Sequence, residues 1–452
     1  MVYLLALTLI VTTVFVYMIR NERIIAPSML FMIPFSLSAF YLILNVSRWS
    51  VVLNLNTYLV IVGGCLSFLV GTSAGKLGFR SRRVKDSGML DFCRKEKEIN
   101  SLTYLLFLFI EVVILFLCIQ GIRRVVHKYG FYGSLSFEMY KYRNLGMYTT
   151  ESVSLGRYLD WAYTFNLSIG YIWAYIFAYR FANKKRVSLL LIACILVPLV
   201  TGFVKGGRQA SVQIIISGLL YYMFFFLRRS SRARLPIKKV LKIVVVVAIL
   251  AVSFQSLGKI LGRTVQADFD QYIAVYLSGC IRNLNEWLKE SHPLPDIFGK
   301  MTFANLYPYL GRKLSRPEWI YALDLPYLSA NGLNSGNIYT TFYAYIYDFG
   351  YIGAVILPFI IGFVSQHTYK RAIKRKSFSE MDIDIPLLFY GYISYLLAFS
   401  FFSNKFYEGL VSISAVRFFI FWFVIKTVIK HSGMINYKFT FGSHSSREEQ
   451  IK

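Results

Sequence analysis

A basic turn that contains two glycines is the first feature of the sequence that could do chemistry. It reads Lys205-Gly206-Gly207-Arg208 and lies between two long apolar runs. The glycines let the backbone approach a ligand closely, and Arg208 begins a predicted helix whose first N–H groups carry partial positive charge. Because Lys205 and Arg208 add two full charges, the turn suits phosphate or pyrophosphate. A basic hairpin that reaches toward lipid headgroups is the alternative interpretation.

An arginine inside an apolar run is the second such feature. Arg417 lies several residues into the last apolar run of the chain. An arginine within a membrane span costs about 2.5–3.5 kcal/mol, so it normally faces a cavity or a partner. We therefore expect Arg417 to face a cavity or a partner and not lipid. A structural ion pair with Glu408 or Glu111 is the alternative.

The long segment 259–350 combines basic and aromatic residues. Aromatic faces can stack on sugar rings, and arginine binds phosphate oxygens in pairs, so this segment indicates a glycan or phosphate ligand. Short amphipathic helices at the membrane interface, with an aromatic belt, are the alternative. The residues concerned are Arg263, Arg282, Arg312, Lys313 and Arg316, with Trp287, Tyr307, Tyr309, Trp319, Tyr321 and Tyr327.

Few residues of the sequence could act as a general base beside these basic groups. The ordinary pKa of His292 suits proton abstraction near neutral pH, and Asp348 is the second candidate; an ordinary surface histidine is the alternative for His292. Glu286, Glu318 and Asp324 are further carboxylates of the same segment. No close carboxylate pair like that of a glycosidase appears, and no Cys/His cluster has metal-ligand spacing. We predict no metal and no cofactor.

The composition decides which class of protein carries these groups. Of 452 residues, 56% are hydrophobic and 16% charged, against about 25% charged in an average soluble domain. Such a chain is too apolar to be disordered or to be an ordinary soluble enzyme. The net charge of +27 would suit nucleic acid, but no hydrophilic basic domain is visible.

The apolar residues are clustered in runs of the length that crosses a membrane, roughly 20 residues. The sequence therefore predicts an all-α, polytopic integral membrane protein with about eleven transmembrane helices. Residues 1–430 form one polytopic domain, and 431–452 form a flexible cytoplasmic tail. The predicted spans are 2–19, 24–46, 56–75, 101–120, 159–180, 187–204, 209–227, 243–258, 351–369, 385–403 and 411–429.

The placement of basic residues predicts how these spans are oriented. Most of the 50 Lys and Arg residues fall in the short segments on one side, which the positive-inside rule makes cytoplasmic. The N-terminus is then outside and the C-terminus inside. The segments 121–158 and 259–350 become external loops, and the second is expected to contain an amphipathic helix over 268–290 and a further short helix over 338–350.

Three segments carry a resemblance to a known family. They are Gly206-Gly207-Arg208-Gln209-Ala210, the stretch from Asn331-Gly332-Leu to Asp348-Phe-Gly350-Tyr-Ile-Gly353, and Glu408-Gly409-Leu410 with Arg417-Phe-Phe. In their order and spacing the chain resembles the Wzy-type polymerases of bacterial surface polysaccharides, the oligosaccharide repeat unit group that includes the enterobacterial common antigen polymerase.

The resemblance implies an enzyme at the outer face of the bacterial plasma membrane. Such a glycosyltransferase moves a glycan from undecaprenyl pyrophosphate to a hydroxyl of a second lipid-linked repeat unit, without an established metal requirement. Its other partners would be the bilayer, a chain-length regulator and a flippase. In this chain the implied pyrophosphate ligands are Arg208 and Arg417, helped by Lys205, Arg282 and Arg312. His292 or Asp348 would be the base, and Gly206, Gly207, Asn337 and Tyr339 would support the glycan.

Other functions fit the same hydropathy profile. A flippase or transporter for lipid-linked oligosaccharides is one, although such proteins usually show internal repeats and none is visible. An O-antigen ligase-like transferase shares the chemistry but uses a different acceptor. A membrane acyltransferase would normally place a histidine and a polar partner within its spans.

Overall fold

The structure of the protein is a computed structural model. It describes residues 1–77, 98–148, 153–230, 268–321, 323, 325–375 and 378–448, and a few residues between 236 and 258. For 433–448 it describes the backbone alone.

The described chain is mostly helical, and its sheet is a single short hairpin. The first half contains α1 (Val2–Met18), α2 (Pro27–Leu44), α3 (Val46–Trp49), α4 (Leu55–Leu77), α5 (Ser101–Lys128), α6 (Leu135–Tyr148), α7 (Arg157–Ala182), α8 (Leu189–Val204) and α9 (Gln209–Arg229). The second half contains α11 (Phe269–Ala274), η1 (Val275–Gly279), α12 (Cys280–Trp287), α13 (Tyr307–Lys313), η2 (Pro317–Trp319), β1 (Leu328–Ala330), β2 (Leu333–Gly336), α14 (Thr341–Lys374), α15 (Ile385–Ala398), α16 (Lys405–Leu410) and α17 (Ile413–Glu448).

The long helices coincide with the apolar runs of the sequence. Ten of the eleven predicted spans fall on described helices, and the run 243–258 lies outside the continuously described residues. Within the described part, five helices are long and apolar enough to cross a membrane: α2, α4, α5, α9 and α14. The chain is thus a helical membrane protein by its helices, and the total of eleven spans stays a prediction.

The outward face of α5 shows why a bilayer is needed. A helix packed in a water-soluble protein turns polar residues outward, whereas α5 exposes Phe109 with 70% of its side chain accessible and Phe116 with 59%. Contiguous apolar surface of this kind belongs against lipid or another protein. The same face also exposes Leu102, Leu105, Leu106, Ile110, Val112, Val113 and Leu117.

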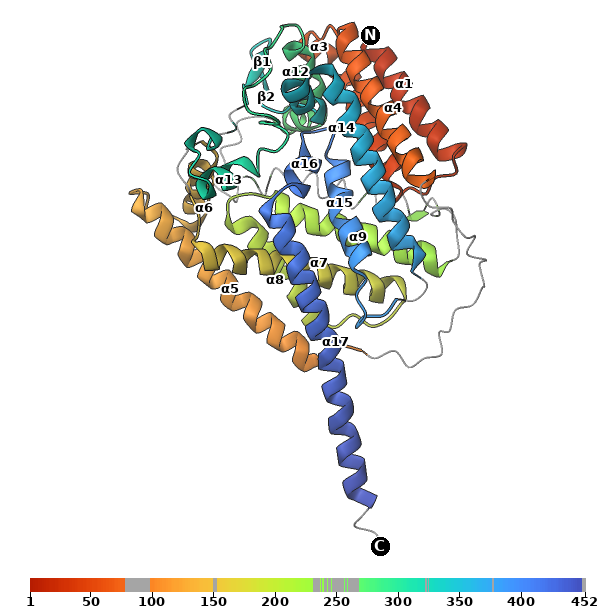
Figure 1. Ribbon diagram of the computed structural model, residues 1–452, viewed down its shortest axis with the longest axis vertical. Helices are drawn as coiled ribbons and strands as arrows, with labels where there is room; N and C mark the ends of the chain where they lie inside the picture. The colour runs from red at the N-terminus through yellow and green to blue at the C-terminus, as the bar shows by residue number, and fades with distance from the viewer. Residues whose placement is uncertain are drawn as a thin grey trace.

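Glycines bring α4 and α14 into close backbone contact. A Cβ on Gly71 would lie 2.1 Å from the carbonyl oxygen of Phe359, and one on Gly362 would lie 2.2 Å from that of Phe68. Small residues permit this approach between helices in membranes, where close packing replaces the hydrophobic effect as the source of association. The pair forms one side of the bundle (Figure 1).

The short elements α12, α13 and the β1–β2 hairpin gather at one end of the molecule, on the side opposite the protruding end of α17 (Figure 1). The predicted helix over 268–290 is present as α11, η1 and α12. Its first residues, 268–270, are exposed, whereas Cys280–Asn285 are all buried. The α12 part of this helix is therefore enclosed by protein and does not lie on the surface as an amphipathic helix would. The predicted short helix over 338–350 is the first arm of α14, which bends at Gly350 with φ +62°.

Two boundaries differ from the sequence prediction. Helix α5 continues to Lys128, beyond the predicted end of its span at residue 120, because residues 121–128 contain no proline and still bury apolar side chains. Helix α17 runs to Glu448, so most of the tail predicted to be flexible is helical in its backbone. The tail residues 449–452 lie outside the described chain.

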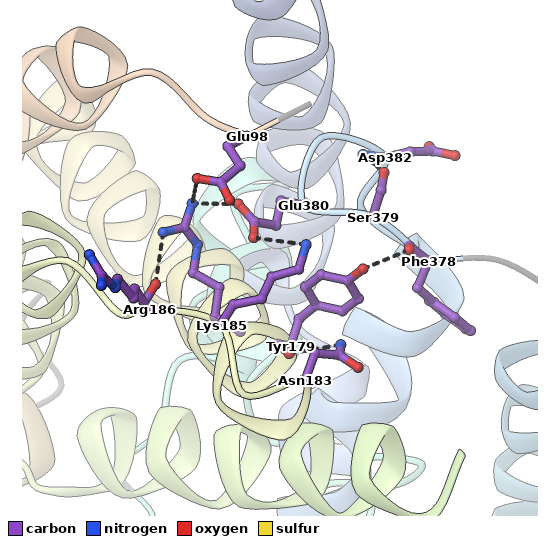
Figure 2. A network of polar contacts seen from close by, with 10 residues as sticks. Glu98, Tyr179, Asn183, Lys185, Arg186, Phe378, Ser379, Glu380 and Asp382 are labelled. Atoms are coloured by element: carbon purple, nitrogen blue, oxygen red, sulfur yellow. Dashed lines mark hydrogen bonds and ion pairs between the residues drawn. The ribbon is translucent and has the colours of Figure 1, made fainter. Parts of the chain in front are cut away.

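A network of ion pairs lies at the C-terminal end of α7 (Figure 2). Arg180, at the end of α7, donates to Glu380 at 2.7 Å and to Glu98 at 3.5 Å. Lys185 lies 4.0 Å from Glu380. Tyr179 donates to the carbonyl of Phe378 at 3.1 Å. Burial raises the pKa of Glu380, and Arg180 opposes that shift. The ion pair between them joins the α14–α15 connection to α7.

The close contact of α4 with α14 gives a first prediction. Gly71→Ala should lower the thermal stability of the purified protein in detergent, because the added methyl group would meet the Phe359 carbonyl. The matched control is Gly63→Ala on the same helix, where a Cβ meets nothing within 4 Å. Fluorescence-detected melting compares the two variants. Equal melting temperatures for the two variants would mean that the α4–α14 contact is not constrained by size.

Candidate functional site

Three of the basic residues singled out in the sequence lie at the ends of α8, α9 and α17. Lys205 follows α8 directly, and Arg208 precedes α9 as its N-terminal cap residue. Arg417 lies near the start of α17. Asp160 and Trp161, near the start of α7, contact Lys205 and Arg417 respectively. We call this set, Asp160, Trp161, Lys205, Arg208 and Arg417, the outer cluster, after the side on which the sequence prediction places it.

Arg208 is buried in the cluster, with 4% of its surface exposed. Its guanidinium donates to the phenol of Tyr272 at 3.0 Å and to that of Tyr276 at 3.4 Å. Both tyrosines lie on the α11–η1 helix of the long loop. Burial raises the pKa of Tyr272, so that phenol is neutral at physiological pH. The guanidinium of Arg208 thereby joins the start of α9 to the helix formed by α11 and η1.

The two phenols also extend the cluster toward α16. The rings of Tyr272 and Tyr276 lie 4.7 Å apart between centroids. Tyr276 stacks on Phe402 at 5.6 Å with an interplanar angle of 12°. Phe402 belongs to the connection between α15 and α16, and Arg417 follows shortly afterwards in the chain. Sequence reasoning missed both tyrosines, since nothing in their spacing connects them to Arg208.

The two glycines of the turn do different things. Gly206 has φ +71°, and a Cβ there would lie 2.3 Å from the carbonyl oxygen of Met139 on α6. A Cβ on Gly207 would meet nothing within 4 Å. Gly206 is therefore required for packing against α6, whereas Gly207 leaves open space beside Arg208.

Lys205 is neutralised within the protein. Its ammonium lies 2.7 Å from a carboxylate oxygen of Asp160 and 4.2 Å from the ring centroid of Tyr163. The charge of Lys205, which the sequence prediction counted as available to a ligand, is thus offset by Asp160. The sequence feature that could have indicated this pairing is Asp160, an acidic residue in the first turn of a predicted span. A single sequence does not show which basic residue it pairs with.

Arg417 differs from Lys205 in its surroundings. Its guanidinium carbon lies 5.0 Å from the ring centroid of Trp161, within cation–π range. Its Nε is buried and has no hydrogen-bond partner among the described residues. A buried donor without a partner costs about 1–3 kcal/mol, and more when it is charged.

The two ion pairs that would have made Arg417 structural are absent from the described residues. Glu408 pairs with Lys405 at 2.9 Å. Glu111 is fully buried and accepts from the indole of Trp173 at 2.6 Å. Both alternative partners are thus engaged elsewhere, and Arg417 keeps its charge beside an aromatic face.

Arg282 belongs to another part of the structure. It is buried and donates to the hydroxyl of Ser335 at 2.9 Å and to the carbonyl of Ser329 at 3.1 Å. These contacts hold the β1–β2 hairpin against α12, and Asn283 adds bonds to the carbonyls of Ser335 and Gly336. The structure therefore does not place Arg282 with the outer cluster, because its donors stabilise the hairpin.

The remaining predicted residues of the long loop are also separate from the cluster. Arg312 is exposed at the end of α13, and Asn337 is half-buried after the hairpin. Tyr339 is buried and donates to the carbonyl of Pro326 at 3.0 Å. Burial raises its pKa to about 12. Tyr339 thus anchors the loop, while Arg263 and Asp324 lie outside the described residues.

The two candidate bases have unequal access to a substrate. His292 is exposed and stacks on Trp287 at 4.3 Å, with its Nε2 at 2.9 Å from the Trp287 carbonyl. Because a carbonyl can only accept, we assign the proton to Nε2, which leaves Nδ1 with the lone pair in the neutral ring. Asp348 is buried, and its carboxylate accepts from the backbone N–H of Thr302 at 2.6 Å and of Met301 at 3.1 Å.

Comparisons with known proteins add no relative. No family model, no curated protein and no solved structure matches the chain. In the part of the chain that the structure describes, no group of three or more His, Cys, Asp or Glu could hold a metal ion.

The contacts of Asp348 give a second prediction. Asp348→Ala should lower the free energy of unfolding by about 1–3 kcal/mol, because two buried N–H groups lose their acceptor. Asp348→Asn should lose less, since the amide oxygen can still accept from the same groups. Asp296→Ala, at an exposed carboxylate of the same loop, should be neutral and serves as the control. An unchanged stability of Asp348→Ala would show that the carboxylate has no structural role and would return it to the list of bases.

Proposed function

We propose that the protein is a glycosyltransferase that polymerises lipid-linked repeat units of a bacterial surface polysaccharide. It takes a glycan from undecaprenyl pyrophosphate and transfers it to a hydroxyl of a second lipid-linked unit. The observation that carries the proposal is Arg417, a guanidinium at the start of a long apolar helix whose buried Nε has no partner in the described residues.

The surroundings of Arg417 support an anionic ligand. A charge in an apolar helix is normally matched by an opposite charge or a ligand, and the two carboxylates that the sequence offered as partners, Glu408 and Glu111, are bound to other groups. Trp161 holds the guanidinium carbon at 5.0 Å from its ring centroid and so fixes its position. A pyrophosphate would complete the site, because guanidinium binds phosphate oxygens bidentately.

Arg208 supports the same ligand from α9. It lies at the N-terminal cap of that helix, where the unpaired N–H groups of the first turn favour an anion. A Cβ at Gly207 would meet nothing within 4 Å, so the backbone beside Arg208 is open on that side. Lys205, paired with Asp160, would act by fixing the turn relative to α7.

The proposed reaction uses these charges at the leaving group. The bond between the anomeric carbon and the pyrophosphate oxygen breaks, and its electron pair stays on the pyrophosphate. A bond forms from the acceptor oxygen to the anomeric carbon, and the acceptor proton passes to a base. Arginines that are already in place stabilise the negative charge as it develops. His292 is the more accessible of the two candidate bases, since Asp348 is occupied by backbone N–H groups.

The proposal includes a place and partners. The protein would lie in the bacterial plasma membrane with the outer cluster and the long loop on the external side. Its polyprenyl substrate would reach the cluster through the lipid-facing apolar surfaces of the bundle. A flippase would supply the lipid-linked unit, and a chain-length regulator would act on the product.

The third prediction tests the role of Arg417. Arg417→Ala should slow polymer formation about a hundredfold or more, because transition-state charge loses a fixed donor. Arg417→Lys should retain part of the activity, since it keeps the charge without the bidentate geometry. The assay follows polymer length with purified protein in lipid nanodiscs and undecaprenyl pyrophosphate-linked repeat units. Arg316→Ala, at an exposed arginine paired with Glu318, is the matched control.

Three outcomes in cells separate the proposal from its alternatives. In cells that carry the Arg417→Ala variant, single repeat units on surface lipid without long polymer support a polymerase. Repeat units retained on the cytoplasmic face indicate a flippase instead. Long polymer of normal length in a folded Arg417→Ala variant would overturn the role of Arg417 in the reaction.

A further inference from the structure

A groove with apolar walls lies between α7, α8 and α9, away from the outer cluster. Its volume is about 540 Å³, which lies within the usual range for sites that hold small molecules, about 300–1,000 Å³. Among the described residues, every wall residue is apolar or a tyrosine, and two lysines complete the lining. Its lining includes Phe177, Ile192, Leu196, Leu219, Tyr222 and Lys239.

The groove opens to the lipid side of the bundle. Leu196 is 53% exposed and Phe181 is 56% exposed, although both line the cavity. On α8 the lining extends from Ile192 to Leu199, which at 1.5 Å per residue is about 10 Å of helix. One leaflet of a bilayer contributes about 15 Å of hydrocarbon, so the groove matches one chain from a single leaflet.

Two lysines stand at one end of this apolar groove. Lys239 and Lys242 both belong to its lining and lie three residues apart, a spacing that places them on the same face where the backbone is helical. Lys239 donates to the hydroxyl of Tyr222 at 3.0 Å and lies 5.1 Å from the ring centroid of Phe226. These contacts hold its charge at the mouth of the groove.

The position of this end identifies the leaflet. It lies near the end of α7 that carries Arg180, and near Arg228 and Arg229 at the end of α9. This is the basic end of the bundle, which the positive-inside rule places at the cytoplasmic surface. Basic pockets between helices on that side bind anionic lipid headgroups.

We propose that the groove between α7, α8 and α9 is a binding site for an anionic phospholipid of the cytoplasmic leaflet. One acyl chain occupies the apolar walls, and the phosphate-containing headgroup contacts Lys239 and Lys242. The site is separate from the proposed pyrophosphate site, since none of the described residues that line it belongs to the outer cluster. Its occupant is a structural or regulatory lipid and not the glycan donor.

The fourth prediction tests the headgroup. The purified full-length protein is exchanged into micelles with equal parts of phosphatidylglycerol and phosphatidylcholine, and the retained lipid is counted by native mass spectrometry. The wild type should retain phosphatidylglycerol preferentially. The double variant Lys239→Gln, Lys242→Gln should lose roughly thirtyfold in that preference, from about 1 kcal/mol per basic residue. Lys184→Gln with Lys238→Gln removes two lysines that lie outside the lining and should keep the preference.

A second pair of variants tests the acyl chain. Leu196→Trp fills the groove and should abolish retention of both lipids, whereas Val200→Trp, exposed on the same helix but outside the lining, should retain them. Retention of both lipids in equal amounts by the wild type would overturn the anionic headgroup. Retention by Leu196→Trp as strong as by the wild type, or no lipid retained by the wild type, would overturn the groove as a lipid site. Polymerisation is assayed on the same samples, so that a failure of the lipid proposal can be distinguished from a failure of the polymerase proposal.

Discussion

The cost of placing a charged side chain among apolar helices is the constraint on which the outer cluster depends. Such a charge is normally matched by an opposite charge or a ligand, and the two cases among the described residues differ in whether the protein supplies one. Lys205 receives the carboxylate of Asp160. Arg417 receives an aromatic face and keeps a donor atom without a partner. Both contacts fall on the first turn of α7, which therefore positions the groups at the ends of α8 and α17.

A comparison with the basic end of the bundle clarifies this difference. Arg180 is as buried as Arg208, with 6% of its surface exposed, and its Nε also lacks a hydrogen-bond partner among the described residues. Its terminal nitrogens, however, reach Glu380 and Glu98 (Figure 2), so its charge is matched inside the protein. Removing one partner of such a buried pair destabilises a fold strongly. The burial of Arg180 is thus explained by its ion pairs within the protein, whereas no such ion pair explains Arg417 among the described residues.

The sequence predicted the helices well because a bilayer imposes a simple rule on them. A run of roughly 20 apolar residues has few options other than a helix, and the runs 56–75 and 209–227 became α4 and α9 within a few residues. The helix over 268–290 was also predicted, through its amphipathic pattern. The pattern did not show how far this helix is buried. Cys280–Asn285 are all buried, because the hairpin and α2 cover a face that the sequence alone leaves open.

Side-chain partners were the part of the site that the sequence did not predict, because each joins residues far apart in the chain. Arg282 and Arg312 have the same residue type in the same loop, yet one is buried against Ser335 and the other is exposed. The number of charges in the loop does not distinguish the two arginines. Only the fold determines which arginine donates its hydrogen bonds to backbone and hydroxyl groups. The same argument narrows the candidate site. Because Lys205, Arg282 and Asp348 are bound to protein groups, the outer cluster contains one buried guanidinium nitrogen without a hydrogen-bond partner among the described residues, the Nε of Arg417 near the start of α17.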